Sequence, residues 1–252
     1  MTSNLYAQEQ ASPMSEPYNP ITALHYAAYR PPLHAIILGR VLSNEETFNQ
    51  GLDVGCGTGY SAVALAKYCA HVYGVDPSQS MLQKTAPHEK ITYQQGAADD
   101  LHLPDRSIDV VTFAGSLFYA KSNSLTKELQ RVCRAQALVI PYDFEVLLAG
   151  VLQLCGLQPE KIKSVYNYAV DFSDCPDLTE LMKGKEQVNL EVTAAELAHI
   201  LLASAYRYGA FVKKYAVADP FPTLVKELGS INENHILKVN IYFSKYRLKT
   251  QY

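Results

Sequence analysis

The stretch from Leu52 to Gly59 constrains the fold of this chain more than any other segment. It reads Leu-Asp-Val-Gly-Cys-Gly-Thr-Gly, so a short apolar run ends in an acid and is followed by three glycines at alternate positions. A segment of helical character, Tyr60–Tyr68, comes next, and a second apolar run then ends in Asp76. Strand, glycine turn, helix, strand and terminal acid form the layout of a nucleotide-binding β-α-β unit. The sequence therefore predicts that this part of the chain binds a nucleotide.

The composition indicates a water-soluble globular protein of 252 residues, which is one large domain or a domain with an insertion. The net charge of −3 argues against nucleic acid as the main partner. We expect no membrane span, because no run of 18 or more apolar residues occurs. The polar N-terminus lacks a signal-peptide pattern, which favours a cytoplasmic protein. No metal site is expected, because the cysteines are scattered and form no close pair: Cys56, Cys69, Cys133, Cys155 and Cys175.

Apolar periodicity predicts alternating helices and strands around the glycine turn. Apolar residues recur at helical spacing between Pro32 and Leu42, which predicts a helix there. The expected strands are Gly51–Val54, His71–Asp76, Ile91–Gln95, Ile108–Ala114 and Ala137–Pro141, and the expected helices are Ser61–Lys67, a helix capped by Ser78 that runs through Met81-Leu82, and Thr126–Arg134. Strands separated by helices predict an α/β protein with a doubly wound, Rossmann-like parallel sheet.

The rest of the chain does not continue this rhythm. Residues 1–20 are expected to be a flexible tail, residues 21–141 the nucleotide-binding core, and residues 142–234 a mostly helical inserted cap. Inside the cap, Thr193 and Glu196 have the spacing of a capping box, which predicts a helix from there to about Val212. Residues 235–252 alternate between apolar and polar side chains, which predicts a half-buried strand that completes a mixed sheet in the antiparallel direction.

The spacing of the glycines bears on which nucleotide is bound. A dinucleotide turn has the pattern G-x-G-x-x-G, and here Tyr60 would stand at its last glycine, where a side chain obstructs the approach of helix and strand. The pattern present is D-x-G-x-G-x-G, from Asp53 to Gly59. It resembles motif I of the class I S-adenosylmethionine-dependent methyltransferases, in particular the methyltransferase type 11 group that includes trans-aconitate and ubiquinone-biosynthesis enzymes.

The resemblance extends over about Ile21 to Pro141. Ser107-Ile108-Asp109-Val110-Val111 resembles the family's entry to its fourth strand, and Glu128–Arg134 resembles the helix that precedes its fifth. Two departures stand out. Ala135-Gln136-Ala137 replaces the usual Pro-Gly-Gly, so the turn before strand five must be built differently. Phe118-Tyr119 stands where relatives often carry His-Trp, which removes one candidate base.

The resemblance and the residue chemistry together predict the site. Glycines allow close backbone approach to the methionine end of the cofactor, Asp76 would accept hydrogen bonds from the ribose hydroxyls, and Asp53 would meet the ammonium group directly or through water. The predicted cofactor-binding residues are Tyr26, Arg30, Asp53, Gly55, Cys56, Gly57, Gly59, Asp76, Pro77, Met81, Ala98, Asp99 and Ala114. The predicted substrate-binding residues are Tyr29, Tyr119, Ser204, Tyr206 and Arg207, and the candidate catalytic residues are His25, Tyr26, Tyr119 and His199.

These features predict methyl transfer from S-adenosylmethionine to a small-molecule acceptor by in-line displacement, in a monomer or homodimer with no nucleic-acid or membrane partner. A non-catalytic S-adenosylmethionine-binding module is the first alternative, and a nicotinamide-dependent oxidoreductase is the second. The acceptor and its reacting atom cannot be read from these residues.

Overall fold

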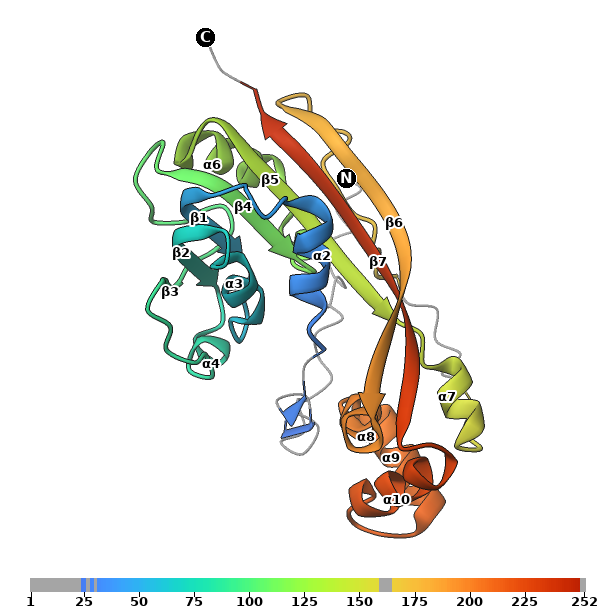
Figure 1. Ribbon diagram of the computed structural model, residues 1–252. Coiled ribbons are helices and arrows are strands. Elements are labelled where there is room, and N and C mark those ends of the chain that lie inside the picture. Colours follow the sequence, from blue (N-terminus) through green and yellow to red (C-terminus); the bar gives the residue numbers. More distant parts are fainter. Residues whose placement is uncertain (1–23, 26–27, 30, 159–164, 250–252) are drawn as a thin grey trace, which may run out of the picture. The chain divides into compact units, whose positions relative to one another are not determined.

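A seven-stranded mixed sheet organises the protein in a computed structural model that describes residues 24–25, 28–29, 31–158 and 165–249. The strands lie in the order β3-β2-β1-β4-β5-β7-β6, as Figure 1 shows. Neighbouring strands from β3 to β5 are parallel, and β7 pairs with β5 in the antiparallel direction. Their bounds are β1 Phe48–Val54, β2 Cys69–Asp76, β3 Ile91–Gln95, β4 Ile108–Ala114, β5 Cys133–Val146, β6 Leu178–Thr193 and β7 Asn234–Leu248. The predicted α/β class, with its antiparallel C-terminal strand, is confirmed.

The chain divides into two compact units, which we describe separately. The core unit contains, among the described residues, 32–147, 165–189 and 238–249. The helical unit contains 24–25, 28–29, 31, 148–158 and 190–237. Strands β6 and β7 each contribute residues to both units.

Most residues of the central strands β1 and β4 are buried, as expected for parallel strands that helices accompany. Leu52 of β1 and Val111 and Phe113 of β4 are each 0% exposed. Helix α6 (Asn123–Val132) adds Leu125, Leu129 and Val132 to the same cluster, and the Ser122 side chain caps its first turn by accepting from the Leu125 amide. Burying a leucine or phenylalanine contributes about 1.5–3 kcal/mol each, so this cluster holds the sheet in place.

Helices α2 (Leu33–Val41), α3 (Tyr60–Leu65) and α4 (Gln79–Leu82) of the core unit lie close to the predicted positions. The short helix α5 (Leu117–Ala120) was not predicted. The predicted capping role of Ser78 is wrong, because its side chain makes no capping hydrogen bond to α4. Its hydroxyl instead lies 2.9 Å from the Ser80 hydroxyl, and its amide donates to Asp76.

The segment that replaces Pro-Gly-Gly forms an irregularity within β5. The register with β4 shifts between the Ile108–Cys133 and Val110–Leu138 pairs. Gln136 takes up the extra length with a φ of +67°, in the left-handed region that favours glycine. The chain therefore enters β5 through a bulge in place of the Pro-Gly-Gly turn.

Strand β6 was not predicted from the sequence. Most of its side chains are exposed, and it lies at the edge of the sheet beside β7. Charged residues such as Lys183 and Glu186 are common on edge strands, where they discourage pairing with other chains. By contrast, the alternation predicted for β7 is confirmed, because Leu237, Val239 and Ile241 are buried.

The helical unit consists mainly of α7 (Ala149–Leu154), α8 (Ala194–Leu202), α9 (Ala205–Tyr215) and α10 (Phe221–Ile231). The predicted capping box is confirmed: Thr193 and Glu196 cap the start of α8 reciprocally. The prediction of a single helix to Val212 is wrong. Helix α8 ends at Leu202, and the Ser204 side chain caps the start of a second helix, α9. Within the part of the chain that the structure describes, no helix has the length and apolar character needed to cross a membrane.

Candidate functional site

The glycine turn lies at the carboxyl end of β1, where the chain turns into α3. Gly55, Gly57 and Gly59 all have positive φ angles, of +71°, +54° and +89°. A side chain on Gly55 would overlap Ser116, and one on Gly59 would overlap the Tyr93 ring. At Gly57 the nearest atom to an added Cβ would be Met81 Cε, 3.7 Å away. A side chain at Gly55 or Gly59 would therefore clash with a neighbouring residue. A side chain at Gly57 would clash with nothing, so the space beside the Gly57 backbone is open to a ligand.

Asp53 is enclosed beneath this turn. Its side chain is 0% exposed, and its two oxygens accept from the Ser61 hydroxyl at 2.5 Å and from the Thr112 hydroxyl at 2.8 Å. Burial raises the pKa of this carboxyl group to about 6, while the two hydrogen bonds partly oppose the shift. Asp53 thus links β1, α3 and β4. It offers no exposed surface to a ligand in this arrangement, so its predicted contact with a cofactor ammonium stays a prediction.

Asp76, at the end of β2, faces the same turn. Its carboxylate accepts from the Gly57 amide and from the Ser78 amide, both at 2.8 Å. Each carboxylate oxygen has two acceptor positions, so these two bonds leave room for one more on each oxygen. The side chain is 8% exposed. The structure thus brings Gly57, Asp76 and Met81 together at one edge of the sheet.

The remaining predicted cofactor residues follow neighbouring strands. Ala98 and Asp99 are the two middle residues of a tight turn closed by the Asp100 amide donating to Ala97 O at 3.1 Å. Ala98 packs against the core cluster and Asp99 is exposed. Pro77 directly follows Asp76, and its carbonyl accepts from the Gln95 side chain. Ala114 ends β4, next to β1 in the sheet.

Cys56 lies inside the glycine turn and is 4% exposed. Burial raises the pKa of its thiol well above the usual range, and the nearby Asp53 and Asp76 raise it further. The thiol is therefore protonated at neutral pH and unsuited to nucleophilic attack. Its small, buried side chain fills space inside the turn.

With this geometry in hand, comparison with known proteins identifies the family. Residues 52–140 match the sequence profile described as "Methyltransferase domain". This segment is a class I S-adenosylmethionine-dependent methyltransferase domain. The family predicted from the sequence is thereby confirmed, and S-adenosylmethionine is the methyl donor typical of it.

Individual methyltransferases are similar to part of this chain. A candidate methyltransferase of Dictyostelium discoideum is 26% identical over 123 residues, covering 48% of this chain and 47% of its own. The uncharacterized methyltransferase YcgJ of Bacillus subtilis is 34% identical over 103 residues, covering 38% of each chain. Because the chain spans about half or less of the length of these relatives, the activity of the whole protein is a matter for proposal.

Solved structures support the fold. A methyltransferase described as type II, from Anaeromyxobacter dehalogenans, superposes with a TM-score of 0.58 at 21% identity, covering 88% of this chain and 98% of its own. The YcgJ structure gives a TM-score of 0.50 at 16% identity, covering 87% and 99%. The strand order also separates the methyltransferase domain from the dinucleotide fold, whose usual order ends 4-5-6. The predicted obstruction by Tyr60 does not distinguish the two folds. Its side chain is 45% exposed at the start of α3 and does not lie between the helix and the strand.

Two predicted catalytic histidines meet inside the helical unit. The Nδ1 atoms of His25 and His199 are 2.9 Å apart, so one ring donates a hydrogen bond to the other. Phe221 packs against both rings. Burial lowers the pKa of each histidine, and each therefore favours the neutral form. A catalytic role for the pair stays a prediction.

The predicted substrate residues of the helical unit have structural partners. The Ser204 side chain caps α9 by accepting from the Arg207 amide, and the Arg207 guanidinium donates to the carbonyl of Leu201, at the end of α8. Tyr206 is 49% exposed and Tyr29 is partly buried. Their substrate contacts stay predictions, and Tyr26 and Arg30 lie outside the described residues.

Sequence reasoning missed a second group of residues in the core unit. Asp143, near the end of β5, accepts from the Tyr166 hydroxyl at 2.5 Å. The predicted residue Tyr119 packs against the Tyr166 ring, with centroids 5.7 Å apart. Asp143 and Tyr166 are 23 positions apart, and no motif connects them. The one available signal was an apolar run that ends in an acid, the signal that singled out Asp53 and Asp76.

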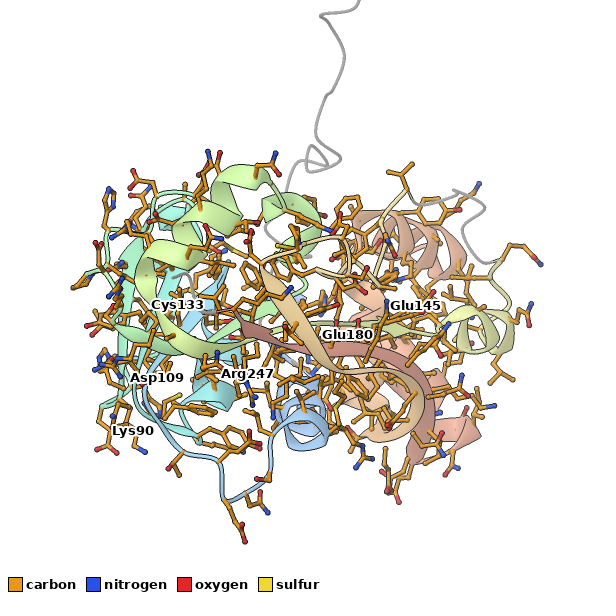
Figure 2. All side chains as sticks on the ribbon, turned by 90° about the horizontal axis from the view of Figure 1, so that it is seen from above. Lys90, Asp109, Cys133, Glu145, Glu180 and Arg247 are labelled. Atoms are coloured by element: carbon orange, nitrogen blue, oxygen red, sulfur yellow. The ribbon has the colours of Figure 1, made fainter. Side chains whose placement is uncertain are left out.

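Two surface depressions of the core unit lie elsewhere. One, between α2 and β6, is lined by residues including Arg40 and Glu186. The other is lined by Lys90 and Asp109, at the amino ends of β3 and β4. Figure 2 shows Lys90 and Asp109 on the same side as Cys133, at the start of β5, and away from Glu145 near its end. Neither depression coincides with the carboxyl-terminal edge where the predicted cofactor residues meet.

Proposed function

We propose that the chain transfers a methyl group from S-adenosylmethionine to a small-molecule acceptor by in-line displacement. The main support is the hydrogen bond from the Gly57 amide to the Asp76 carboxylate, which joins the carboxyl ends of β1 and β2. Ligands of open α/β sheets bind outside the carboxyl ends of the strands. The methyltransferase domain covers these same residues.

The residues at this edge fit the cofactor. The carboxylate of Asp76 has acceptor positions that suit two adjacent ribose hydroxyls. The open position at Gly57 allows a ligand to approach the backbone, where a side chain would obstruct it. Asp99 is exposed beside Ala98 and is available to the adenine end. When bound, S-adenosylmethionine supplies an electrophilic methyl group on a sulfonium that is already a good leaving group.

The protein's contribution under this proposal is positioning. Holding an acceptor in near-attack geometry contributes up to ~7–11 kcal/mol to lowering a barrier in favourable cases. A small acceptor is favoured over nucleic acid by the net charge of −3. The Asp53 hydrogen bonds to Ser61 and Thr112 keep the turn rigid, so its backbone can act as a fixed cradle.

Product formation by the Asp76→Asn variant tests this proposal. The chain is incubated with S-adenosylmethionine and a fractionated small-molecule extract, and S-adenosylhomocysteine is quantified by mass spectrometry. We expect the wild type to form it and Asp76→Asn to lose at least about tenfold in rate, because a hydrogen bond to a charged group contributes about 1.5–3 kcal/mol. Asp100→Asn, which changes an exposed acid in the nearby turn, is the matched control and should keep its rate.

Two results would contradict the proposal. Equal rates of S-adenosylhomocysteine formation by Asp76→Asn and the wild type would show that Asp76 does not bind the cofactor. Binding of S-adenosylhomocysteine without turnover of any fraction would favour the non-catalytic module instead.

A further inference from the structure

We propose that Asp143 and the aromatic rings around it bind the amino group of a small amine, and that Asp143 accepts the proton the amine loses during methyl transfer. This rests on the proposed function and names the acceptor class for it. Every residue used in the argument belongs to the core unit.

Asp143 lies close to the glycine turn. Gly115 follows directly after β4, and an added Cβ on it would lie 3.2 Å from Asp143 Oδ1. The next residue, Ser116, packs against Gly55 so closely that a side chain on Gly55 would overlap it, and its hydroxyl donates to the Val54 carbonyl. Gly115 and Ser116 thus connect Asp143 to the turn at the end of β1 through direct packing contacts. An acceptor beside Asp143 is therefore near the predicted methyl donor.

Asp143 Oδ1 accepts from the Phe144 amide at 2.7 Å, and the contacts of Oδ2 leave a place for one proton. The Tyr166 hydroxyl lies 2.5 Å from Asp143 Oδ2 and 2.8 Å from the Gly115 carbonyl oxygen. A tyrosine hydroxyl has one hydrogen and cannot donate fully to both oxygens. If Asp143 carries a proton, it donates to the Tyr166 oxygen, and Tyr166 donates to Gly115, so both short contacts are satisfied. Burial also raises the pKa of Asp143 to about 6, which suits a group that gains and releases a proton near neutral pH.

The Tyr166 ring, whose hydroxyl contacts Asp143, lies at the centre of a group of aromatic rings. The Tyr166 ring has centroid distances of 4.7 Å to Phe118, 5.7 Å to Tyr119 and 4.8 Å to Tyr168. Tyr119 is 54% exposed, which leaves the cluster accessible from solvent. Aromatic faces beside a carboxylate attract cations, and ammonium groups are recognised in this way. An anionic acceptor would instead meet repulsion from Asp143.

The far end of the cluster already holds a cation of this type. Tyr168 stacks on Tyr242 with centroids 6.0 Å apart, and the Lys185 ammonium lies 5.0 Å from the Tyr242 ring centroid. Glu145, two residues after Asp143 on β5, accepts from the Tyr242 hydroxyl at 3.3 Å. Among the described residues, the ionisable groups on the neighbouring elements of the core unit include His34, Tyr119, Tyr142, Glu145, Tyr166, Tyr168, Lys185 and Tyr242.

The step balances in atoms and charge. The ammonium form of the acceptor gives one proton to the Asp143 carboxylate and becomes a neutral amine. The nitrogen lone pair then forms the new bond to the methyl carbon while the carbon–sulfur bond breaks. The electrons of that bond stay on sulfur, which becomes a neutral thioether. The positive charge of the sulfonium ends on the methylated nitrogen, and the proton on Asp143 returns to solvent.

Fragment binding tests this inference without any cofactor. Benzylamine, benzyl alcohol and benzoate have similar shapes but carry positive, zero and negative charge. Ligand-observed NMR titrations at pH 7.5 should show benzylamine binding tightest and benzoate weakest. Asp143→Asn should weaken benzylamine about tenfold, because it removes a charge-assisted hydrogen bond. Asp100→Asn, an exposed acid elsewhere in the core unit, should leave binding unchanged.

Two measurements on the wild type keep the inference testable if Asp143→Asn fails to fold. The fragment order needs no variant, and benzylamine affinity should fall as the pH drops below about 6 and Asp143 becomes protonated. Benzoate binding as tightly as benzylamine, or no effect of Asp143→Asn in a folded protein, would overturn the inference. A parallel titration with S-adenosylhomocysteine separates the two proposals, because its binding without benzylamine binding rejects the amine site alone, and its failure rejects the proposed function.

Discussion

The Asp53 carboxylate is a buried group around which the glycine turn is assembled. Its folded pKa of about 6 lies above the ordinary value of 3.8. The folded state therefore holds this proton more tightly than the unfolded state. By linkage, its contribution to stability is greatest at low pH and is lost as the pH rises from about 4 to about 6.

The Asp53→Asn variant should remove this loss. A shift of about two pKa units corresponds to up to about 3 kcal/mol, and asparagine carries no charge to be desolvated. Urea unfolding of wild type and Asp53→Asn at pH 4 and pH 7 measures the difference. We expect the variant to gain stability relative to the wild type as the pH rises. If the free energy of unfolding changed with pH by the same amount in both proteins, Asp53 would ionise in the folded state without loss of stability, which would contradict the prediction.

Single residues also show what sequence could and could not predict. The glycines and Asp76 lie within one β-α-β unit, so their spacing along the chain was enough to place them together. Asp143 and Tyr166 meet only because β5 runs beside Gly115, a contact that depends on the tertiary fold. For the same reason, the hydroxyl partners that enclose Asp53 could not be read from the turn sequence alone.

Among the secondary-structure elements, burial decided which strands were predictable. Strand β7 has one buried face, and its alternation of apolar residues was visible in the sequence. Strand β6 is an edge strand with mostly exposed side chains, so it carries no apolar pattern, although it is 16 residues long. The boundary between α8 and α9 was missed because apolar residues continue on both sides of Ser204. Only the structure shows that Ser204 caps the start of a second helix.

The capping box at the start of α8 gives a prediction for the helical unit. Thr193 accepts from the Glu196 amide, and Glu196 accepts from the Thr193 amide at 2.8 Å. Thr193→Ala should lower the free energy of unfolding by about 1 kcal/mol, because a helix amide loses its partner. Thr193→Ser keeps the hydroxyl and should lose much less. Urea unfolding followed by far-ultraviolet circular dichroism compares the three proteins, and equal losses in both variants would show that the cap contributes nothing.

Across the molecule, the sheet topology explains why the cofactor prediction was possible and the acceptor prediction was not. Adjacent parallel strands bring the ends of β1, β2 and β4 to one edge, so motifs that follow each strand meet there. The region that matches the family, residues 52–140, contains these motifs and stops before Asp143 and Tyr166. The residues that we propose for the amine lie in the part of the chain where the resemblance ends, and only the fold connects them to the site.

Calorimetric titration of the full chain with S-adenosylhomocysteine, and separately with NAD⁺, tests the central claim most directly. The glycine turn, Asp76 and the strand order lead us to expect saturable binding of S-adenosylhomocysteine at one site and no heat of binding from NAD⁺. Binding of NAD⁺ in place of S-adenosylhomocysteine, or binding of neither ligand, would contradict the account.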